Sequence, residues 1–236
     1  MIKVYGFGPN MGVPDPSPFV LKVLAYLKFA GIEHELVGGI GNLQKAPRGK
    51  LPFIDDNGEK VSDSSLILQY LAEQYAVDLD KGLSEEQRAN AFMYSKVLDE
   101  CYYWCVLYCR WQSDDNWPMM KSRFFKSLPP VVRNIAPNLV RRNTKKSLHA
   151  QGMGRLTQDE VLELSNEVLH SLSVLLGDKP YFFGREPASF DAIAYGHLGE
   201  MILSEFIGPF VDQAKSYDNL VAYCQRIQAE FFAEPE

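Results

Sequence analysis

The sequence predicts an α/β domain followed by an all-α domain. Within the first 75 residues, the apolar patterns follow the order strand, helix, strand, hairpin and helix. Beyond residue 84 only helical patterns occur, and two of them open with capping boxes. A chain of 236 residues can bury one large core or two small ones. We therefore expect domains at 1–76 and 84–236, joined by a linker at Val77–Leu83.

The N-terminus predicts a strand, a loop and a helix. Residues Ile2–Phe7 are rich in β-branched and aromatic side chains, which indicates a strand. Residues 8–18 hold four prolines and two glycines, a composition typical of a loop. Pro18 suits the first helical position and Ser17 the N-cap before it, so a helix is expected from Pro18 to Ala30.

A second strand at Ile32–Gly38 precedes a predicted β-hairpin. The hairpin turn is Asn57-Gly58, because both turn positions favour a positive φ. Pro52 stands at the entry to the hairpin and is a candidate for a cis peptide bond. Such a bond would turn the backbone groups of Leu51 outward, where an extended ligand could pair with them as an added strand.

The next helix opens within a cluster of serine and aspartate at residues 62–65 and fades by Tyr75. Its first N–H groups and its dipole favour an anion at this end. An ordinary capped helix is the alternative interpretation. The order β-α-β, then β-β-α, is the thioredoxin-like plan.

The second domain is expected to be all-helical. Ser84 with Gln87 forms one capping box, which opens a long helix through about Trp111, and Thr157 with Glu160 forms another. The cysteines at positions 101, 105 and 109 recur at helical spacing. We interpret them as a buried apolar stripe rather than as metal ligands, since metal sites usually need ligands from several directions.

Charge is unevenly distributed along the chain, whose formal net charge is −6. Residues 116–158 contain nine basic residues and no acidic one, which leaves 24 − 9 = 15 basic against 30 acidic residues elsewhere. This basic segment could attract an anionic ligand or an acidic protein face, or could simply be solvated. The acidic balance and the lack of a recognised motif argue against nucleic-acid binding.

No apolar run of about 18 residues is present, so we expect neither a membrane span nor a membrane partner. The first residues lack the basic-then-apolar pattern of a signal peptide, so we expect a cytoplasmic protein.

Several motifs together resemble the glutathione S-transferase superfamily. Gly49-Lys50-Leu51-Pro52, the hairpin and Asp63-Ser64 resemble the glutathione-binding half of its thioredoxin-like domain, and Ser17-Pro18-Phe19 resembles the signature of its serine-type members. The finer pattern resembles the failed-axon-connections and metaxin-like branch. The segments that carry this second resemblance are Gln151–Arg155, Leu176–Gly184 and Asp191–Leu198.

The resemblance implies a site for glutathione and a small electrophile. It implies that Ser17 is the catalytic residue, with Tyr5 a weaker rival. The implied substrate-binding residues are Lys50, Leu51, Pro52, Asp63, Ser64, Tyr103 and Trp104. Lys50, or its neighbour Arg48, would meet the glycine carboxylate of glutathione. Tyr103 and Trp104 would wall the electrophile pocket, although core packing is the alternative for such aromatic residues.

The resemblance also implies a homodimer and an all-helical glutathione-transferase C-terminal domain. A transferase-like module used for protein–protein contacts is the rival hypothesis. A thiol-disulfide enzyme ranks last, because position 17 holds serine rather than cysteine. The family's Ser/Thr-x-x-Asp box departs here: Ala188 occupies the cap position before Asp191, and Ser189 is the candidate substitute cap.

Overall fold

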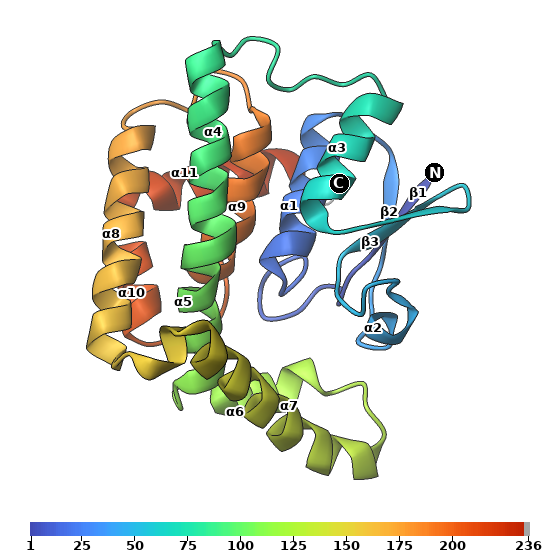
Figure 1. Cartoon of the computed structure of the whole chain (residues 1–236), viewed down its shortest axis with the longest axis vertical. Coiled ribbons are helices and arrows are strands. Elements are labelled where there is room, and N and C mark those ends of the chain that lie inside the picture. The colour runs from blue at the N-terminus through green and yellow to red at the C-terminus, as the bar shows by residue number, and fades with distance from the viewer. Residues whose placement is uncertain (234–236) are drawn as a thin grey trace.

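A computed structural model describes residues 1–233 and confirms the predicted architecture: a mixed four-stranded sheet lies beside an array of helices (Figure 1). The strand order is β2-β1-β3-β4. β1 pairs parallel with β2 and antiparallel with β3, which pairs antiparallel with β4. The strands are β1 Ile2–Tyr5, β2 His34–Val37, β3 Phe53–Asp56 and β4 Glu59–Ser62. This is the thioredoxin-like order.

Three helices complete the first domain: α1 Pro18–Phe29, α2 Asn42–Lys45 and α3 Ser64–Gln74. α1 and α3 lie between the sheet and the helical domain (Figure 1). Ser17 caps α1 as predicted, with its side chain accepting from the backbone N–H of Val20. The short α2 falls within the segment predicted only as a connection.

The second domain is all-helical, as predicted. Its elements are α4 Glu85–Val97, η1 Leu98–Tyr102, α5 Tyr103–Leu107, η2 Tyr108–Gln112, α6 Trp117–Met119, η3 Met120–Phe124, α7 Pro130–Gln151, η4 Met153–Arg155, α8 Gln158–Leu176, α9 Ser189–Ile202, α10 Pro209–Lys215 and α11 Asp218–Phe231. The capping boxes at Ser84 and Thr157 are both confirmed.

The long helix predicted from Ser84 to about Trp111 is continuous from α4 to η2, but it is not a regular α-helix. η1 and η2 are π-helical, with wider turns that each hold an extra residue. Cys105 and Cys109 lie buried on it, as predicted, whereas Cys101 is only half-buried. Burial raises the pKa of the Cys105 and Cys109 thiols to about 12.

α9 forms the centre of the helical domain and packs against α1 of the first domain. A Cβ atom added to Gly196 would lie 2.6 Å from the carbonyl oxygen of Pro18. A residue without a side chain is therefore needed where the two helices cross.

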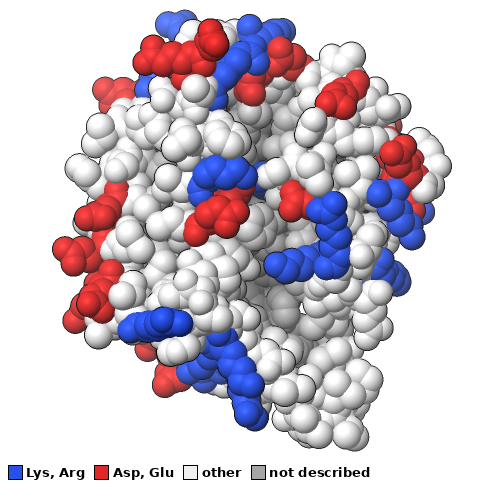
Figure 2. Space-filling model, in the orientation of Figure 1, with Lys and Arg blue, Asp and Glu red and all other residues white. Residues whose placement is uncertain are grey.

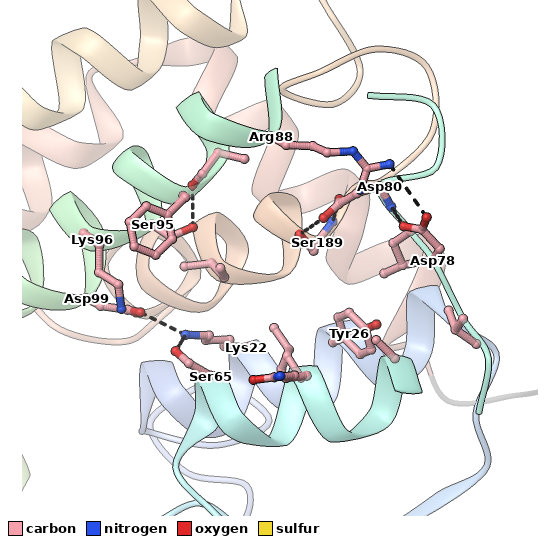
Figure 3. Close-up of a pocket in the computed structure, with 18 residues that line it drawn as sticks. Lys22, Tyr26, Ser65, Asp78, Asp80, Arg88, Ser95, Lys96, Asp99 and Ser189 are labelled. Atoms are coloured by element: carbon pink, nitrogen blue, oxygen red, sulfur yellow. Dashed lines mark hydrogen bonds and ion pairs between the residues drawn. The ribbon is translucent and has the colours of Figure 1, made fainter. Parts of the chain in front are cut away.

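The start of α9 differs from the expectation that Ser189 would act as its cap. Asp191 accepts from the backbone N–H of Ala188, so one bond of the capping box is present and the other, which needs a side-chain acceptor, is missing. Ser189 does not substitute as the cap. Its N–H and hydroxyl both donate to Asp80 in the segment before α4, an interaction that Figure 3 shows. The physical reason is that Asp80 offers this helix start a carboxylate from outside the helix.

Over residues 1–233, no helix has both the length and the hydrophobicity required to cross a bilayer.

Candidate functional site

One cavity of about 510 Å³ is lined by the expected catalytic residue and by all the expected substrate-binding residues, whereas Tyr5 lies outside its lining. It is lined by Ser17, Lys50, Leu51, Pro52, Asp63, Ser64, Tyr103 and Trp104, together with further residues from both domains. Figure 2 shows a hollow between the two halves of the molecule, rimmed by charged side chains of both signs. The fold therefore brings together residues up to 104 − 7 = 97 positions apart, from Phe7 to Trp104.

Ser17 enters the cavity from the N-terminus of α1. It is 8% exposed, and its hydroxyl oxygen accepts weakly from the N–H of Val20 at 3.4 Å. This acceptor role leaves the hydroxyl proton available to a ligand. The positive end of the α1 dipole lies at the same place, so the position favours a bound anion.

The loop that carries Ser17 is fixed by Asp15, which the sequence analysis did not identify. The completely buried Asp15 carboxylate accepts from the backbone N–H groups of Phe7 at 2.7 Å, Gly8 at 2.8 Å and Ser17 at 3.0 Å. Burial raises the pKa of Asp15 to about 7, against the effect of these hydrogen bonds. An aspartate between two prolines was the available signal, because side chains that satisfy loop N–H groups are typically Asp or Asn.

A second buried group, Arg110, holds the same loop from the helical domain. Its guanidinium donates to the carbonyl oxygen of Pro16 at 2.7 Å, forms an ion pair with Glu200 of α9 and lies over the ring of Phe206. The Ser17 loop is therefore held from both domains.

Asp63 and Ser64 lie at the start of α3. Asp63 is the N-cap, and one of its carboxylate oxygens accepts from the N–H groups of Ser65 and Leu66. Its φ of +85° is unusual for a residue with a side chain and is the kind of local strain that clusters at functional sites. Asp63 thus has a structural role, and its second carboxylate oxygen accepts no hydrogen bond from residues 1–233.

The Leu51–Pro52 peptide bond is cis, as predicted. Leu51 and Pro52 lie on the cavity wall immediately before β3, with Arg48 and Lys50 beside them. Two cations at this edge suit a ligand carboxylate.

Aromatic rings form the wall opposite the sheet. Tyr103 packs edge-on against Phe19 and against Trp104, with ring centroids 4.7 and 5.6 Å apart. Burial raises the pKa of Tyr103, so its hydroxyl stays protonated at neutral pH. Tyr5, the weaker rival to Ser17, stacks on Phe53 with centroids 4.2 Å apart. Phe19 was not nominated beforehand, although it belongs to the Ser-Pro-Phe motif.

A buried charged cluster forms the floor between this cavity and a second one. Lys22 of α1, completely buried, donates to Asp99 of η1 at 2.9 Å and to Ser65 of α3 at 3.1 Å (Figure 3). The other oxygen of Asp99 lies 3.0 Å from Nε2 of His197 on α9. The cluster therefore ties the start of α3, which borders the site, to the helical domain.

Burial and pairing act in opposite directions on the charges of this cluster: burial lowers the pKa of Lys22, and the neighbouring Asp99 raises it. Burial alone would raise the pKa of Asp99, but the hydrogen bond from His197 and the charge of Lys22 together lower it to about 2. Burial lowers the pKa of His197, which is therefore neutral at pH 7. Sequence reasoning missed Lys22, although a lysine within the apolar run Phe19–Leu27 was a visible signal, because lysine is rarely buried unless it is paired.

The second cavity, of about 350 Å³, lies between α1, α3 and α4. It shares Ser65, Lys96 and Asp99 with the first cavity. In Figure 3, the bond of Asp80 to Ser189 and the contact of Arg88 with Asp78 close its far side. The contacts of Asp80 with Ser189 and of Lys22 with Asp99 thus lie at opposite ends of this cavity. The first ties the linker to α9, and the second ties the first domain to the helical domain.

The first cavity can hold an extended peptide-like ligand with charged ends. It is bordered by the N-terminus of α3 with the Asp63 carboxylate, by the Ser17 hydroxyl and by the cations Arg48 and Lys50. Aromatic rings form the remaining wall. Such a site can bind a thiolate beside Ser17 and an apolar molecule next to it.

Comparison with known proteins places this fold and cavity in one family. The glutathione S-transferase N-terminal domain profile matches residues 18–116, and the glutathione S-transferase C-terminal domain profile matches residues 165–227. The chain belongs to the glutathione S-transferase superfamily. It is 35% identical to the isoprene-epoxide–glutathione S-transferase of Rhodococcus sp. (strain AD45), over 98% of this chain and 99% of that protein.

The predicted resemblance to the failed-axon-connections and metaxin-like branch is also confirmed. Failed axon connections of Drosophila melanogaster is 30% identical over 99% of this chain, which spans 59% of that protein. Human metaxin-2 is 28% identical over 91% of this chain and 82% of that protein. Among solved structures, the beta-etherase LigF from Sphingobium sp. strain SYK-6 superposes with a TM-score of 0.62 at 20% identity, covering 97% of this chain and 95% of that one.

Proposed function

We propose that this protein is a glutathione transferase that joins the thiol of glutathione to small electrophiles. The observation that carries the proposal is the convergence of Ser17, the Leu51–Pro52 corner and the start of α3 on one cavity. The family membership makes glutathione the expected co-substrate, and the cavity offers a candidate partner for each of its parts.

The γ-glutamyl end would lie at the start of α3. Ser64 and the helix N-terminus would hold its carboxylate, and the free oxygen of Asp63 would accept from its ammonium group. The cysteinyl part would pair with the backbone of Leu51, next to Pro52. Lys50 or Arg48 would neutralise the glycine carboxylate.

Ser17 would donate its hydroxyl proton to the bound sulfur and so stabilise the thiolate over the thiol. An unperturbed cysteine thiol has a pKa near 8.5, and a helix N-terminus with a hydrogen-bond donor lowers it. The thiolate then attacks an electrophilic carbon held against Phe19, Tyr103 and Trp104. The sulfur–carbon bond forms as the leaving group departs with the electron pair of its own bond.

Epoxides are the first electrophiles to test, because one relative is named for an isoprene epoxide. Attack on an epoxide carbon breaks the carbon–oxygen bond, and the resulting alkoxide takes a proton from water. No separate leaving group has to exit, so the conjugate is the sole product.

The test combines binding and turnover. The wild-type protein should bind immobilised glutathione and conjugate a small epoxide or a chlorinated aromatic. Ser17→Ala should lower kcat/KM roughly a hundredfold while glutathione retention persists, because the lost donor acts on the thiolate. Ser17→Thr keeps a hydroxyl and should recover part of the activity.

Ser171→Ala provides the matched control, since this serine of α8 is exposed and lies outside the cavity. An absence of both retention and turnover in the wild-type protein would contradict the proposal. Equal activity of Ser17→Ala and wild type would remove Ser17 from the mechanism.

We also propose a homodimer in the cytoplasm. Apolar side chains are exposed on neighbouring parts of α3 and α4: Leu66, Phe92, Met93 and Val97. A second copy covering this face would remove them from water. Light scattering of Phe92→Glu against wild type tests the dimer, and fractionation of cells tests the compartment.

The rival is a transferase-like module used for protein–protein contacts, supported by the basic segment 116–158. On that hypothesis, Ser17→Ala would leave cellular function intact, whereas reversing the charges of Lys145 and Lys146 would damage it. The opposite pattern would eliminate the rival.

A further inference from the structure

α7 is an exposed helix whose surface the proposed function does not use. It lies along the lower edge of the molecule, apart from the sheet and from the other long helices (Figure 1). Of its 22 residues, only Pro137 and Leu148 are buried. It packs mainly on η2 and η4, so most of its circumference faces solvent.

The first half of α7 exposes large apolar side chains. Val131 is 74% exposed, Ile135 65% and Leu139 54%, and Val132 is 45% exposed beside them. At about 100° per residue, Val131, Ile135 and Leu139 fall within roughly 80° of arc. They form an apolar ridge rather than scattered exposed residues.

The second half of the same face is basic. Arg142 and Lys146 are exposed and fall within the arc of the apolar ridge, and Lys145 is next to them. In Figure 2, the lobe that overlies the start of α7 is uncharged on this side, and basic side chains lie beside it along the lower edge. The face thus passes from apolar to cationic along the helix axis.

The segment lacks the acidic residues that a solvated helix normally uses. α7 carries five basic residues and no acidic one. Even its first turn has no acidic residue, although negative charge is favoured at a helix N-terminus. Two bases of the basic segment have acidic partners within residues 1–233: Arg123 pairs with Glu205 and Arg141 with Asp114. The other bases of the segment form no ion pair within residues 1–233, so their charges face solvent and any anionic ligand.

We propose that the α7 face, defined as Val131, Val132, Ile135, Leu139, Arg142, Lys145 and Lys146, docks on an anionic phospholipid bilayer. The apolar ridge would enter the boundary between headgroups and acyl chains, and the basic half would lie on the phosphates. This revises the expectation of no membrane partner, which addressed only helices that cross a bilayer.

A bilayer fits this face better than an acidic protein does. The ridge is convex and stands on a single projecting helix, whereas protein partners that read a helix enclose it in a groove. A bilayer responds to total positive charge rather than to individual pairs, which matches bases with no fixed partners.

The experiment measures sedimentation of the full chain with vesicles. Wild type should bind vesicles of mixed phosphatidylcholine and phosphatidylglycerol and not pure phosphatidylcholine, and added salt should release it. Lys145→Glu with Lys146→Glu should lower the partition coefficient about tenfold or more. Ile135→Asp should also lower it about tenfold, because insertion of an apolar side chain is lost.

Two matched controls change equivalent residues elsewhere. Lys81→Glu with Lys215→Glu reverses two exposed lysines outside the basic segment, and Val174→Asp alters the 67% exposed valine of α8. Both should bind like wild type. All altered positions are solvent-exposed or partly so, and thermal unfolding verifies that each variant is folded.

Failure of wild type to bind the mixed vesicles would overturn the proposal. Equal loss of binding in the Lys81 and Lys215 variant would overturn it too, because the charge effect would then be diffuse. Tight binding to polyglutamate that survives Ile135→Asp, without vesicle binding, would assign the face to an acidic protein instead.

Discussion

α9 and α7 are both helices of the second domain, yet they use their polar residues in opposite ways. In α9, 13 of 14 residues are buried, including Asp191, His197 and Glu200. Each of these three has a partner on another element: Tyr223, Asp99 and Arg110, respectively. In α7, most polar side chains face solvent.

The polar residues of α9 serve stability, whereas those of α7 can serve recognition of another molecule. A buried charge is costly unless it is paired, so the polar residues of α9 are structural and their partners are obligatory. Exposed bases contribute little to folding, so those of α7 are free to serve an external ligand. Substitutions in α9 should therefore change the free energy of unfolding, and those of the exposed residues of α7 should change it little.

The largest effect is expected from Glu200→Ala. Removing this carboxylate leaves the Arg110 guanidinium buried without its ion-pair partner, which should destabilise the protein by about 3–5 kcal/mol. Arg142→Ala on α7 is the control and should change stability by less than about 0.5 kcal/mol. Urea unfolding measures the free energy of unfolding of both variants. Similar changes in the two would contradict the proposed difference between α9 and α7.

A smaller loss is expected from Gly196→Ala. The added Cβ would lie 2.6 Å from the Pro18 carbonyl oxygen and 2.9 Å from the backbone nitrogen of Lys22, so α1 must shift. We expect a cost of about 1–3 kcal/mol. Because α1 starts at the site, KM for glutathione should rise as well.

Asn143→Ala in α7 provides the comparison for that helix, because Asn143 is exposed and alanine has the higher helix propensity. It should raise the free energy of unfolding slightly, by up to about 0.7 kcal/mol, and leave KM unchanged. An unchanged KM in a destabilised Gly196→Ala protein would show that the crossing of α1 and α9 does not position the site.

The smallest effect concerns pH. Burial lowers the pKa of His197 below its unfolded value of about 6.5. Below that pH, the unfolded state therefore binds a proton more tightly than the folded state does. This contribution to stability is present above about pH 6.5 and is lost as the pH falls, by at most about 1.4 kcal/mol per pH unit. Asp99, with its pKa lowered to about 2, adds a further loss between about pH 4 and 2.

Unfolding at pH 7.5 and pH 5.5 tests the histidine contribution. His197→Gln keeps a donor toward Asp99 but cannot titrate, so its stability should change less over this interval. His149→Gln, on the exposed surface of α7, should follow wild type. Parallel curves for wild type and His197→Gln would rule out His197 as the source.

The parts of the fold that were predicted from the sequence are set by local chemistry. Asn57-Gly58 forms the hairpin turn, Pro52 lies in a cis bond, and Ser84 and Thr157 cap helices, because each depends on residues a few positions away. The resemblance to a family nominated Ser17, Asp63, Ser64 and other residues that line the cavity, but not Phe19. Their meeting in one cavity depends on the thioredoxin-like plan, which the strand and helix order had indicated.

What could not be predicted depends on distant contacts. Lys22 meets Asp99 77 positions later, and Asp99 meets His197 98 positions later, so no local pattern shows that the three are buried together. The basic segment was visible by composition alone. Its apolar ridge emerged only when α7 placed residues 131 to 146 on one exposed face.

The wide turns η1 and η2 have a consequence for comparing this chain with its relatives. A π-turn accommodates an additional residue, so each one rotates all later side chains by about 100° relative to a regular α-helix. Tyr103 and Trp104 follow η1 directly, so the π-turn sets the direction in which their side chains point. Alignments that treat this stretch as uniform would assign the pocket aromatics of a relative one position away from their true equivalents.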